Sequence, residues 1–371
     1  MKISIERAAL LKALGHVQSV VERRNTIPIL ANVKLAAGEG RLALNATDMD
    51  IDMVESVPAS VAAKGTTTAP AHTLYEIARK LPEGSEVELE ADGEGKLTVR
   101  AGRSRFQLSC LPTEEFPVMG GGTYSHTFTV SAADLRGIID RTRFAISNEE
   151  TRYYLNGIYL HAAKRDKTAV LRAVATDGHR LASVEVPLPK GAAGMPGIIV
   201  PRKTVTELHK LIEDSSDDVE IGVSEAKIRF AFGAAELTSK LIDGTFPDYE
   251  RVIPTGNDKD LDVGRQGFTD AVDRVSAISS EKSRAVKLKL GKNILELSAT
   301  SPENGSASEE IEVAYKGPAI EIGFNARYLL DIAQQMTGDT IRLSMADAAS
   351  PTVLSDAADA SGLYVLMPMR V

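Results

Sequence analysis

The feature of this sequence that most constrains its fold is a threefold internal repeat. The segments 5–10, 130–135 and 263–268 each end an apolar/polar alternation and begin a helical period. Further along each copy, an Ala-Thr pair closes a strand-like run, and these pairs end at Thr47, Thr176 and Thr300. The spacings between copies are 125 and 133 residues at the first landmark, and 129 and 124 at the second. This self-similarity predicts three divergent copies of one domain, with function belonging to the assembly that the copies build.

Glycine and proline mark where one copy gives way to the next. The stretches 120–122 and 254–257 have linker composition, because Gly and Pro interrupt regular structure. The repeat frame therefore predicts domains at 1–122, 123–255 and 256–371, each within the usual size of about 100–200 residues. Within each copy, two helical periods are separated by runs of strand-like alternation, which predicts an α+β fold.

The predicted helices carry more positive charge than the rest of the chain. Six helix windows are expected at 6–24, 71–80, 131–143, 201–214, 265–284 and 325–336. Together they hold 17 Lys and Arg against 12 Asp and Glu, whereas the remaining residues hold 26 against 39. If the helices share one face, that face is positive on an otherwise acidic molecule. Such a face suits a polyanion that is contacted without base readout.

Composition excludes several other classes of protein. The 371 residues are 43% hydrophobic and 25% charged, as in ordinary soluble globular proteins. No apolar run approaches the ~18 residues that span a bilayer, and the strand-like N-terminus lacks a signal-peptide pattern. Cys110 is the single cysteine, so no intrachain disulfide is expected, and we predict a cytoplasmic protein. Trp is absent and aromatics are 5% of residues, which disfavours stacking platforms for bases.

We find no pattern that predicts a metal or cofactor site. The six histidines are scattered, and no phosphate-binding Gly-x-x-x-x-Gly-Lys-Ser/Thr string is present. Asp48, Asp50 and Asp52 alternate, which would place their carboxylates on one side of a strand. Because no Gly-bearing calcium loop follows, we expect a solvated strand face and no divalent ion there.

The most enzyme-like string is Asp177-Gly178-His179-Arg180. An acid–base pair of Asp177 and His179 would suit a hydrolase, but neither a nucleophile nor a third partner is evident. Asp-Gly between two strand-like runs favours a turn instead. A second unusual feature is the apolar C-terminus, residues 366–371. Two interpretations stay open for it: a last strand held in its own sheet, or a tail that helps to line a binding surface.

The threefold repeat is accompanied by four strings that occur in order along the chain, 151–157, 175–181, 246–249 and 367–370. In the repeat and in these strings, the sequence resembles the bacterial beta sliding clamps. These proteins are the processivity subunits of DNA polymerase III. The resemblance implies three DNA-clamp domains, each with two helices packed on antiparallel sheets. It further implies a head-to-tail homodimer that closes a six-domain ring, with helices inside, around duplex DNA. Such a protein is not an enzyme and needs no cofactor. Its implied partners are DNA, the replicative polymerase, the clamp loader and other replication and repair proteins.

The resemblance also implies three sets of site residues. The DNA-contacting set is Arg24, Tyr153, Tyr154, Arg202 and Lys203. The pocket for partner peptides is Leu155, Thr176, Gly178, His179, Arg180, Leu181, Pro247, Arg251, Val252, Asn325, Tyr328, Val365, Leu366, Met367, Pro368, Met369 and Arg370. The dimer contact is Arg103, Arg105, Phe106, Leu108, Ile278 and Glu303.

Some of these residues have a second interpretation. Strand packing would equally explain Tyr153 and Tyr154, and a solvated loop would explain Arg24. Ser283, and the stretch from Ala348 to Pro351, depart from the family pattern, which leaves peptide preference open. A ring-shaped scaffold that does not act on DNA is the alternative function, and the charge of the helix windows disfavours it.

Overall fold

The computed structural model describes residues 1–24, 26–119, 122–213, 215–280 and 284–371. Gly120, Gly121 and Ser283 lie outside the described residues. The chain forms two compact units. Unit 1 comprises Met1–Arg136, Pro189–Met195 and Lys203–Leu241, and unit 2 comprises Gly137–Leu188, Pro196–Arg202 and Ile242–Val371. Among the described helices, none is long and apolar enough to cross a membrane.

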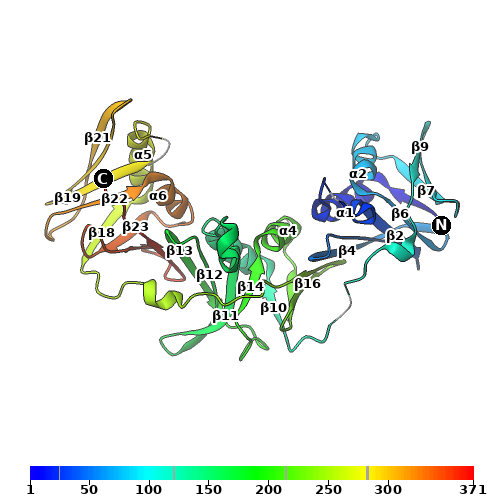
Figure 1. The fold of residues 1–371 in the computed structure, drawn as a ribbon, viewed down its shortest axis with the longest axis horizontal. Helices are drawn as coiled ribbons and strands as arrows, with labels where there is room; N and C mark the ends of the chain where they lie inside the picture. Colours follow the sequence, from blue (N-terminus) through cyan, green and yellow to red (C-terminus); the bar gives the residue numbers. More distant parts are fainter. Residues whose placement is uncertain (25, 120–121, 214, 281–283) are drawn as a thin grey trace. The chain divides into compact units, whose positions relative to one another are not determined.

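Unit 1 contains two antiparallel sheets. The five-stranded sheet has the order β5 (Ser60–Ala63), β1 (Lys2–Glu6), β7 (Glu86–Ala91), β8 (Lys96–Ala101), β9 (Ser104–Ser109). The eight-stranded sheet has the order β10 (His126–Ser131), β15 (Asp218–Val223), β16 (Lys227–Phe232), β17 (Ala235–Lys240), β4 (Ile51–Pro58), β3 (Arg41–Thr47), β2 (Asn32–Gly38), β6 (Gly65–Pro70). Helices α1 (Arg7–Val20) and α2 (Ala71–Lys80) lie side by side, and α1 packs on β3 and β4 (Figure 1).

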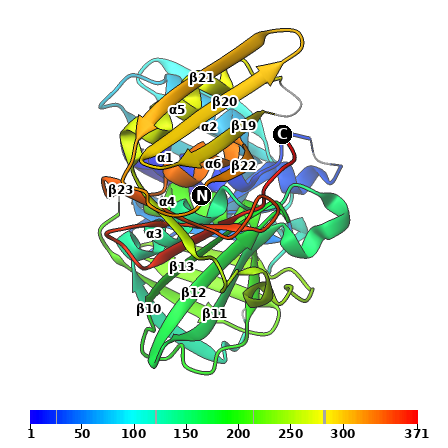
Figure 2. The same ribbon diagram turned by 90° about the vertical axis from the view of Figure 1, so that its left-hand side faces the viewer.

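Unit 2 repeats this plan. Its eight-stranded sheet has the order β14 (Ile198–Pro201), β11 (Gly157–Arg165), β12 (Thr168–Thr176), β13 (Arg180–Pro187), β25 (Gly362–Leu366), β24 (Thr352–Asp356), β23 (Thr340–Met345), β18 (Lys259–Gly264). Its four-stranded sheet has the order β21 (Gly305–Glu312), β20 (Ile294–Ser301), β19 (Ala285–Gly291), β22 (Ile320–Asn325). Helix α5 (Arg265–Ser276) lies behind this ladder, and it contacts α6 (Ala326–Ala333) (Figure 2).

The described residues also form two further helices and four short 3₁₀ turns. Helix α3 (Ala132–Arg143) begins in unit 1 and ends in unit 2, and the first residue of α4 (Arg202–Ile212) belongs to unit 2 while the rest belongs to unit 1. The 3₁₀ turns are η1 (Pro28–Ala31), η2 (Thr113–Glu115), η3 (Glu150–Leu155) and η4 (Tyr249–Val252). In η1 the proline stands at the start, where its missing N–H leaves no hydrogen bond unmade.

The repeat landmarks fall at the same structural points in every copy. The first strands end at Glu6, Ser131 and Gly264, and a helix begins at the next residue each time. The second helices begin directly after Pro70, Pro201 and Asn325. The Asn325 side chain caps α6 by accepting the backbone N–H groups of Arg327 and Tyr328. The predicted α+β class and helix starts are therefore confirmed, although α1, α4, α5 and α6 end earlier than their windows.

Each first helix turns a strip of apolar side chains toward a sheet. In α1, Leu10, Leu14 and Val17 are completely buried, which is the three- and four-residue spacing of one helix face. Phe268 and Val272 do the same in α5. Because each helix buries one face only, its opposite face keeps polar and basic residues such as Lys12, which is exposed.

One expectation and one alternative interpretation about local structure are wrong. Asp48 and Asp50 lie in the turn between β3 and β4, and only Asp52 lies in a strand. The turn forms because Asp48 Oδ1 accepts two backbone N–H groups, from Asp50 (2.9 Å) and from the next residue (2.7 Å). Tyr153 and Tyr154 do not pack in a strand, because both lie in the 3₁₀ turn η3.

Candidate functional site

The Asp-Gly string forms the predicted turn between β12 and β13. Thr176 Oγ1 donates to the Arg180 carbonyl oxygen (2.7 Å) and accepts the Gly178 N–H (3.1 Å). Asp177 Oδ1 accepts the backbone N–H groups of His179 (2.9 Å) and Arg180 (3.0 Å). Gly178 has φ +88°, a left-handed conformation that favours glycine. Because its polar groups are hydrogen-bonded within the turn, this segment is held in one conformation. We call this hydrogen-bonded turn the platform.

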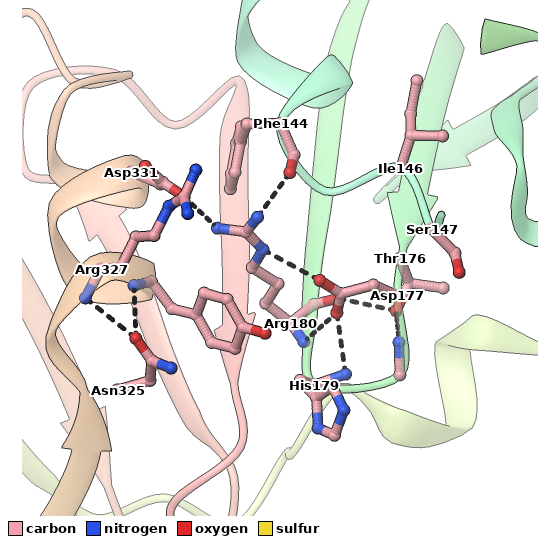
Figure 3. Close-up of polar contacts among 12 residues, drawn as sticks. Phe144, Ile146, Ser147, Thr176, Asp177, His179, Arg180, Asn325, Arg327 and Asp331 are labelled. Carbon is pink, nitrogen blue, oxygen red and sulfur yellow. Dashed lines mark hydrogen bonds and ion pairs between the residues drawn. The ribbon is translucent and has the colours of Figure 1, made fainter. Parts of the chain in front are cut away.

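Arg180 extends from this turn into a buried polar cluster, shown in Figure 3. Its side chain is 10% exposed, and it donates to Asp177 Oδ2 (3.1 Å), Asp331 Oδ2 (2.5 Å) and the Phe144 carbonyl oxygen (2.6 Å). The guanidinium also lies over the rings of Tyr328 (4.3 Å) and Phe144 (5.0 Å). A buried charge needs such partners, so Arg180 joins the turn to helix α6.

A cavity of about 310 Å³ lies beside this turn. It is lined by Arg152, Tyr154, Leu155, Thr176, Gly178, His179, Arg180, Leu181, Pro247, Asp248, Tyr249, Val252, Val365 and Met367. Leu155, Leu181 and Val365 are nearly fully buried, whereas Val252 and Met367 are half exposed. An apolar recess with a few polar groups at its edge suits apolar side chains of a ligand whose backbone stays near water.

The structure brings together ten of the residues predicted for the pocket, from Leu155 to Met367. The other predicted residues lie outside the lining. Arg251 is largely exposed and pairs with Asp248 (2.7 Å), and Leu366 is completely buried within β25. Asn325 is the cap of α6, and Tyr328 stacks near the His179 ring with centroids 6.3 Å apart. The remaining members are Pro368, Met369 and Arg370 of the C-terminal tail.

The lining also contains Arg152, Asp248 and Tyr249, which no sequence pattern predicts as pocket residues, and Tyr154, which was predicted to contact DNA. Arg152 lies three residues before Leu155 in η3, and Tyr249 lies three residues before Val252 in η4. In a 3₁₀ helix, side chains three residues apart lie on the same side. Neither turn is long enough to show this period in the sequence, and η3 is kinked at Arg152, so no local pattern would have identified these residues.

The C-terminal tail fits both interpretations left open above. Its strand β25 pairs with β13 and β24 as far as Leu366. Beyond the strand, the Met367 N–H donates to the His179 carbonyl oxygen, and the Met369 N–H donates to the Gly323 carbonyl oxygen, both at 2.9 Å. The tail is thus held against unit 2 while the Met367 side chain lines the cavity.

The tyrosines and arginines of the predicted DNA-contacting set differ in accessibility. Arg24 is exposed in the segment after α1. Tyr153 is 52% exposed and meets Tyr154 edge to face, with ring centroids 5.8 Å apart. Arg202 is held more tightly, because it donates to the carbonyl oxygens of Ile146 (3.3 Å) and Ser147. Burial lowers the pKa of the Arg202 guanidinium.

Lys203 already has two acidic neighbours in unit 1. Its ammonium group pairs with Asp48 and with Glu22 (3.2 Å). Burial opposes the charged form of Lys203, but the hydrogen bonds and attraction of these two carboxylates outweigh it and raise its pKa. A phosphate would therefore share this cation with Asp48 and Glu22.

The predicted contact between copies falls on two sheet edges. In unit 1, Arg103, Arg105 and Phe106 are exposed on or next to the edge strand β9, and Leu108 is partly exposed. In unit 2, Glu303 is exposed just before the edge strand β21, and the Asn304 side chain donates to the Ile278 carbonyl oxygen (3.4 Å). The two edges carry opposite charges.

Asp177, one of the two residues considered for hydrolysis, is already engaged in structural contacts. Both Asp177 oxygens accept hydrogen bonds, Oδ1 within the turn and Oδ2 from Arg180. Such a carboxylate is poorly placed to take a proton from a substrate. Within the described part of the chain, no cluster of three or more His, Cys, Asp or Glu side chains could hold a metal ion.

Comparison with known proteins covers the whole chain. Models of the DNA polymerase III beta subunit match as N-terminal domain at 1–120, central domain at 129–248 and C-terminal domain at 250–370. The beta sliding clamp of Caulobacter vibrioides is 55% identical, and that of Escherichia coli K12 is 38% identical, each over 100% of both chains.

Solved structures agree. The DnaN sliding clamp of Bartonella birtlesii bound to griselimycin is 50% identical, with a TM-score of 0.97 over 100% of both chains. The Caulobacter crescentus beta sliding clamp with bound polyethylene glycol is 55% identical. Its TM-score is 0.98, over 100% of this chain and 99% of that one.

Proposed function

Because the chain belongs to the DNA polymerase III beta subunit family, the beta sliding clamps, we propose that two copies form a closed ring around duplex DNA. The ring tethers the replicative polymerase to its template. The observation that carries this proposal is the succession of three family domains along the whole chain. We retain 1–122, 123–255 and 256–371 as the proposed domains, which gives six domains in the dimer.

Ring closure is supported by the two oppositely charged sheet edges. The edge strand β9 presents Arg105 and Phe106, and the edge strand β21 carries Glu309, Glu310 and Glu312. An edge strand has unpaired backbone groups that can extend a sheet into another chain. Pairing β9 of one copy with β21 of the next is a head-to-tail contact, and two such contacts close a dimer.

Contact with DNA is proposed to be electrostatic and independent of sequence. The surplus of Lys and Arg in the helix windows supports it, with Arg24 and Tyr153 as the accessible contacts and Tyr154, which is partly buried and lines the cavity, next to Tyr153. Arg202 and Lys203 add positive charge, partly offset by their own partners. Few contacts to phosphate, many of them through water, allow a ring to slide while its closure prevents escape.

The cavity beside Thr176–Arg180 is proposed to bind a short apolar segment of each partner protein. Its buried Leu155, Leu181 and Val365 supply the apolar surface, and Met367 can adapt to different side chains. The polymerase, the clamp loader and repair proteins would compete for it. We propose that the protein is not an enzyme and that it works in the cytoplasm, as its single cysteine suggests. It would act by raising the polymerase concentration at the primer end.

Primer extension tests this function. A singly primed single-stranded circle is incubated with the cognate polymerase and clamp loader, and product length is measured with and without the protein. We expect full-length products only when the protein is present, because a tethered polymerase rebinds the same primer. Product lengths that do not depend on the protein would contradict the proposal.

A further inference from the structure

The peptide pocket has an internal counterpart in unit 1. In unit 2, β13 pairs with β25, with Leu181 opposite Val365. In unit 1, β4 pairs with β17, with Asp52 opposite Thr238. Both strand pairs are antiparallel, and each lies at the centre of an eight-stranded sheet. We call the β4–β17 pair with its turn junction 1, and the β13–β25 pair with its turn junction 2.

The turns of the two junctions have the same hydrogen bonds. In junction 1, Thr47 Oγ1 donates to the Ile51 carbonyl oxygen (2.7 Å) and accepts the Met49 N–H (3.0 Å), as Thr176 does in junction 2. Asp48 accepts two backbone N–H groups in the manner of Asp177. Met49 has φ +76° where Gly178 has φ +88°. The backbone of the platform is therefore present twice in the chain.

The residue that follows each second strand is also matched. The Met367 N–H donates to the His179 carbonyl oxygen (2.9 Å), and the Lys240 N–H donates to the Asp50 carbonyl oxygen (2.8 Å). This register aligns three positions. Leu181, Val365 and Met367 of junction 2 correspond to Asp52, Thr238 and Lys240 of junction 1.

The side chains at these three positions are opposite in character. In junction 2 they are the apolar walls of the cavity. In junction 1, Asp52 accepts a hydrogen bond from Asn45 (2.9 Å), and Lys240 pairs with Asp50 (3.0 Å). Thr238 is 8% exposed. Burial raises the pKa of the Asp52 carboxyl. This direction indicates that the carboxyl has limited contact with solvent.

We propose that Asp52, Thr238 and Lys240 are specificity-determining residues that exclude apolar peptides from junction 1. An apolar side chain seated there would remove the remaining water from Asp52 and cover the Lys240–Asp50 ion pair without replacing their hydrogen bonds. Of the two junctions, only junction 2 therefore binds a peptide, although both have the platform. This inference rests on the proposed role of junction 2 as the partner-peptide pocket.

Calorimetric titration of the full chain tests the inference. The probe is a synthetic ten-residue peptide whose only apolar side chains are an adjacent Leu and Phe. We expect one peptide per wild-type chain and two per chain in the triple variant Asp52→Leu, Thr238→Val, Lys240→Met. A triple variant that melts like the wild type and still binds one peptide would overturn the inference.

Two further variants locate the new site. Met367→Lys introduces the junction 1 residue into junction 2, and we expect it to bind less than a tenth as tightly as the wild type. Adding the triple substitution to Met367→Lys should restore binding of one peptide. If the triple variant does not melt cooperatively, the double variant Asp52→Leu, Lys240→Met, which keeps the buried Thr238, replaces it in the same titration. We then expect a second peptide that binds more weakly than the first, because the Thr238 hydroxyl remains.

A matched control separates apolarity from loss of charge. Asp52→Asn with Lys240→Gln removes both charges but adds no apolar surface, and we expect it to bind one peptide per chain. Two peptides on this control would show that charge alone excludes the second peptide, which would contradict the role given to the apolar walls. A wild-type chain that binds no peptide would instead contradict the proposed function of junction 2.

Discussion

The guanidinium of Arg180 connects the turn beside the cavity to helix α6 of unit 2. Arg180 contributes both its backbone to the turn and its charge to Asp331, which lies 151 residues further along the chain. It is held between the rings of Phe144 and Tyr328. Because charged hydrogen bonds shielded from water are stronger than exposed ones, this contact fixes the position of the turn relative to α6.

Replacing Asp331 with Asn should weaken this connection without changing the size of the side chain. A hydrogen bond between charged groups contributes about 1.5–3 kcal/mol, and Arg180 keeps Asp177 as a second carboxylate. We therefore expect a lower urea midpoint for unfolding and weaker binding of the Leu-Phe peptide. Glu321→Gln is the control, because Glu321 is exposed and its ion pair with Lys287 is long, at 3.8 Å. Equal shifts of the urea midpoint in the Asp331→Asn and Glu321→Gln variants would contradict the role of Asp331.

The single thiol should react slowly in the folded protein. Burial raises the pKa of Cys110, and the negative charge of Asp92 adds to this, against a hydrogen bond with Thr67 that lowers it. Less thiolate is then present near neutral pH, and the thiolate is the reactive form. We expect slower alkylation by iodoacetamide at pH 7.5 in the folded protein than in urea. The difference should narrow as pH rises, whereas a constant ratio would indicate restricted access in place of a raised pKa.

At the scale of single residues, the sequence predicts the contacts between residues that lie close together along the chain. The Asp177–Arg180 turn is recognisable because Asp-Gly turns are local. The pairs of Arg180 with Asp331 and of Lys203 with Asp48 join residues on different elements. No local pattern specifies such pairs, so the charge of Lys203 is visible in the sequence, whereas its two acidic partners are not.

At the scale of elements, the clearest prediction concerns strand β9 as the contact between two copies of the chain. It is an edge strand, and Phe106 is 37% exposed on it. If β9 pairs with another copy, Phe106→Asp would bury a charge in the contact, at a cost of about 3–5 kcal/mol. Sedimentation should show monomers for Phe106→Asp and dimers for the conservative control Phe106→Leu. A dimeric Phe106→Asp variant would place the contact elsewhere.

The elements differ in how far the sequence predicts them. Helices that follow Pro70 and Pro201 are predictable, because proline favours a first helical position and apolar residues then recur at helical spacing. The turns η3 and η4 are too short to show a period, so Tyr153 and Tyr154 were equally compatible with a strand. Asp48 and Asp50 alternate as strand residues do, yet the side chain of Asp48 forms a turn.

At the scale of the whole molecule, the threefold repeat explains why the same folding plan recurs. It also explains why two junctions share one backbone and differ in their side chains. The predicted family is confirmed by domain models that cover 1–120, 129–248 and 250–370. The same backbone platform occurs in junctions 1 and 2, but apolar walls are found in one only. Repeated domains thus supply a shared framework, and substitutions at a few matched positions give one copy its binding surface.

We propose that the protein holds DNA by encircling it. The most direct measurement loads the protein onto nicked circular DNA with a clamp loader at moderate salt, and then cuts the circle. A closed ring that contacts phosphates weakly should stay on the circle and slide off the linear form. We expect retention before the cut and loss after it. Equal retention on both forms would indicate ordinary electrostatic binding and would contradict the claim.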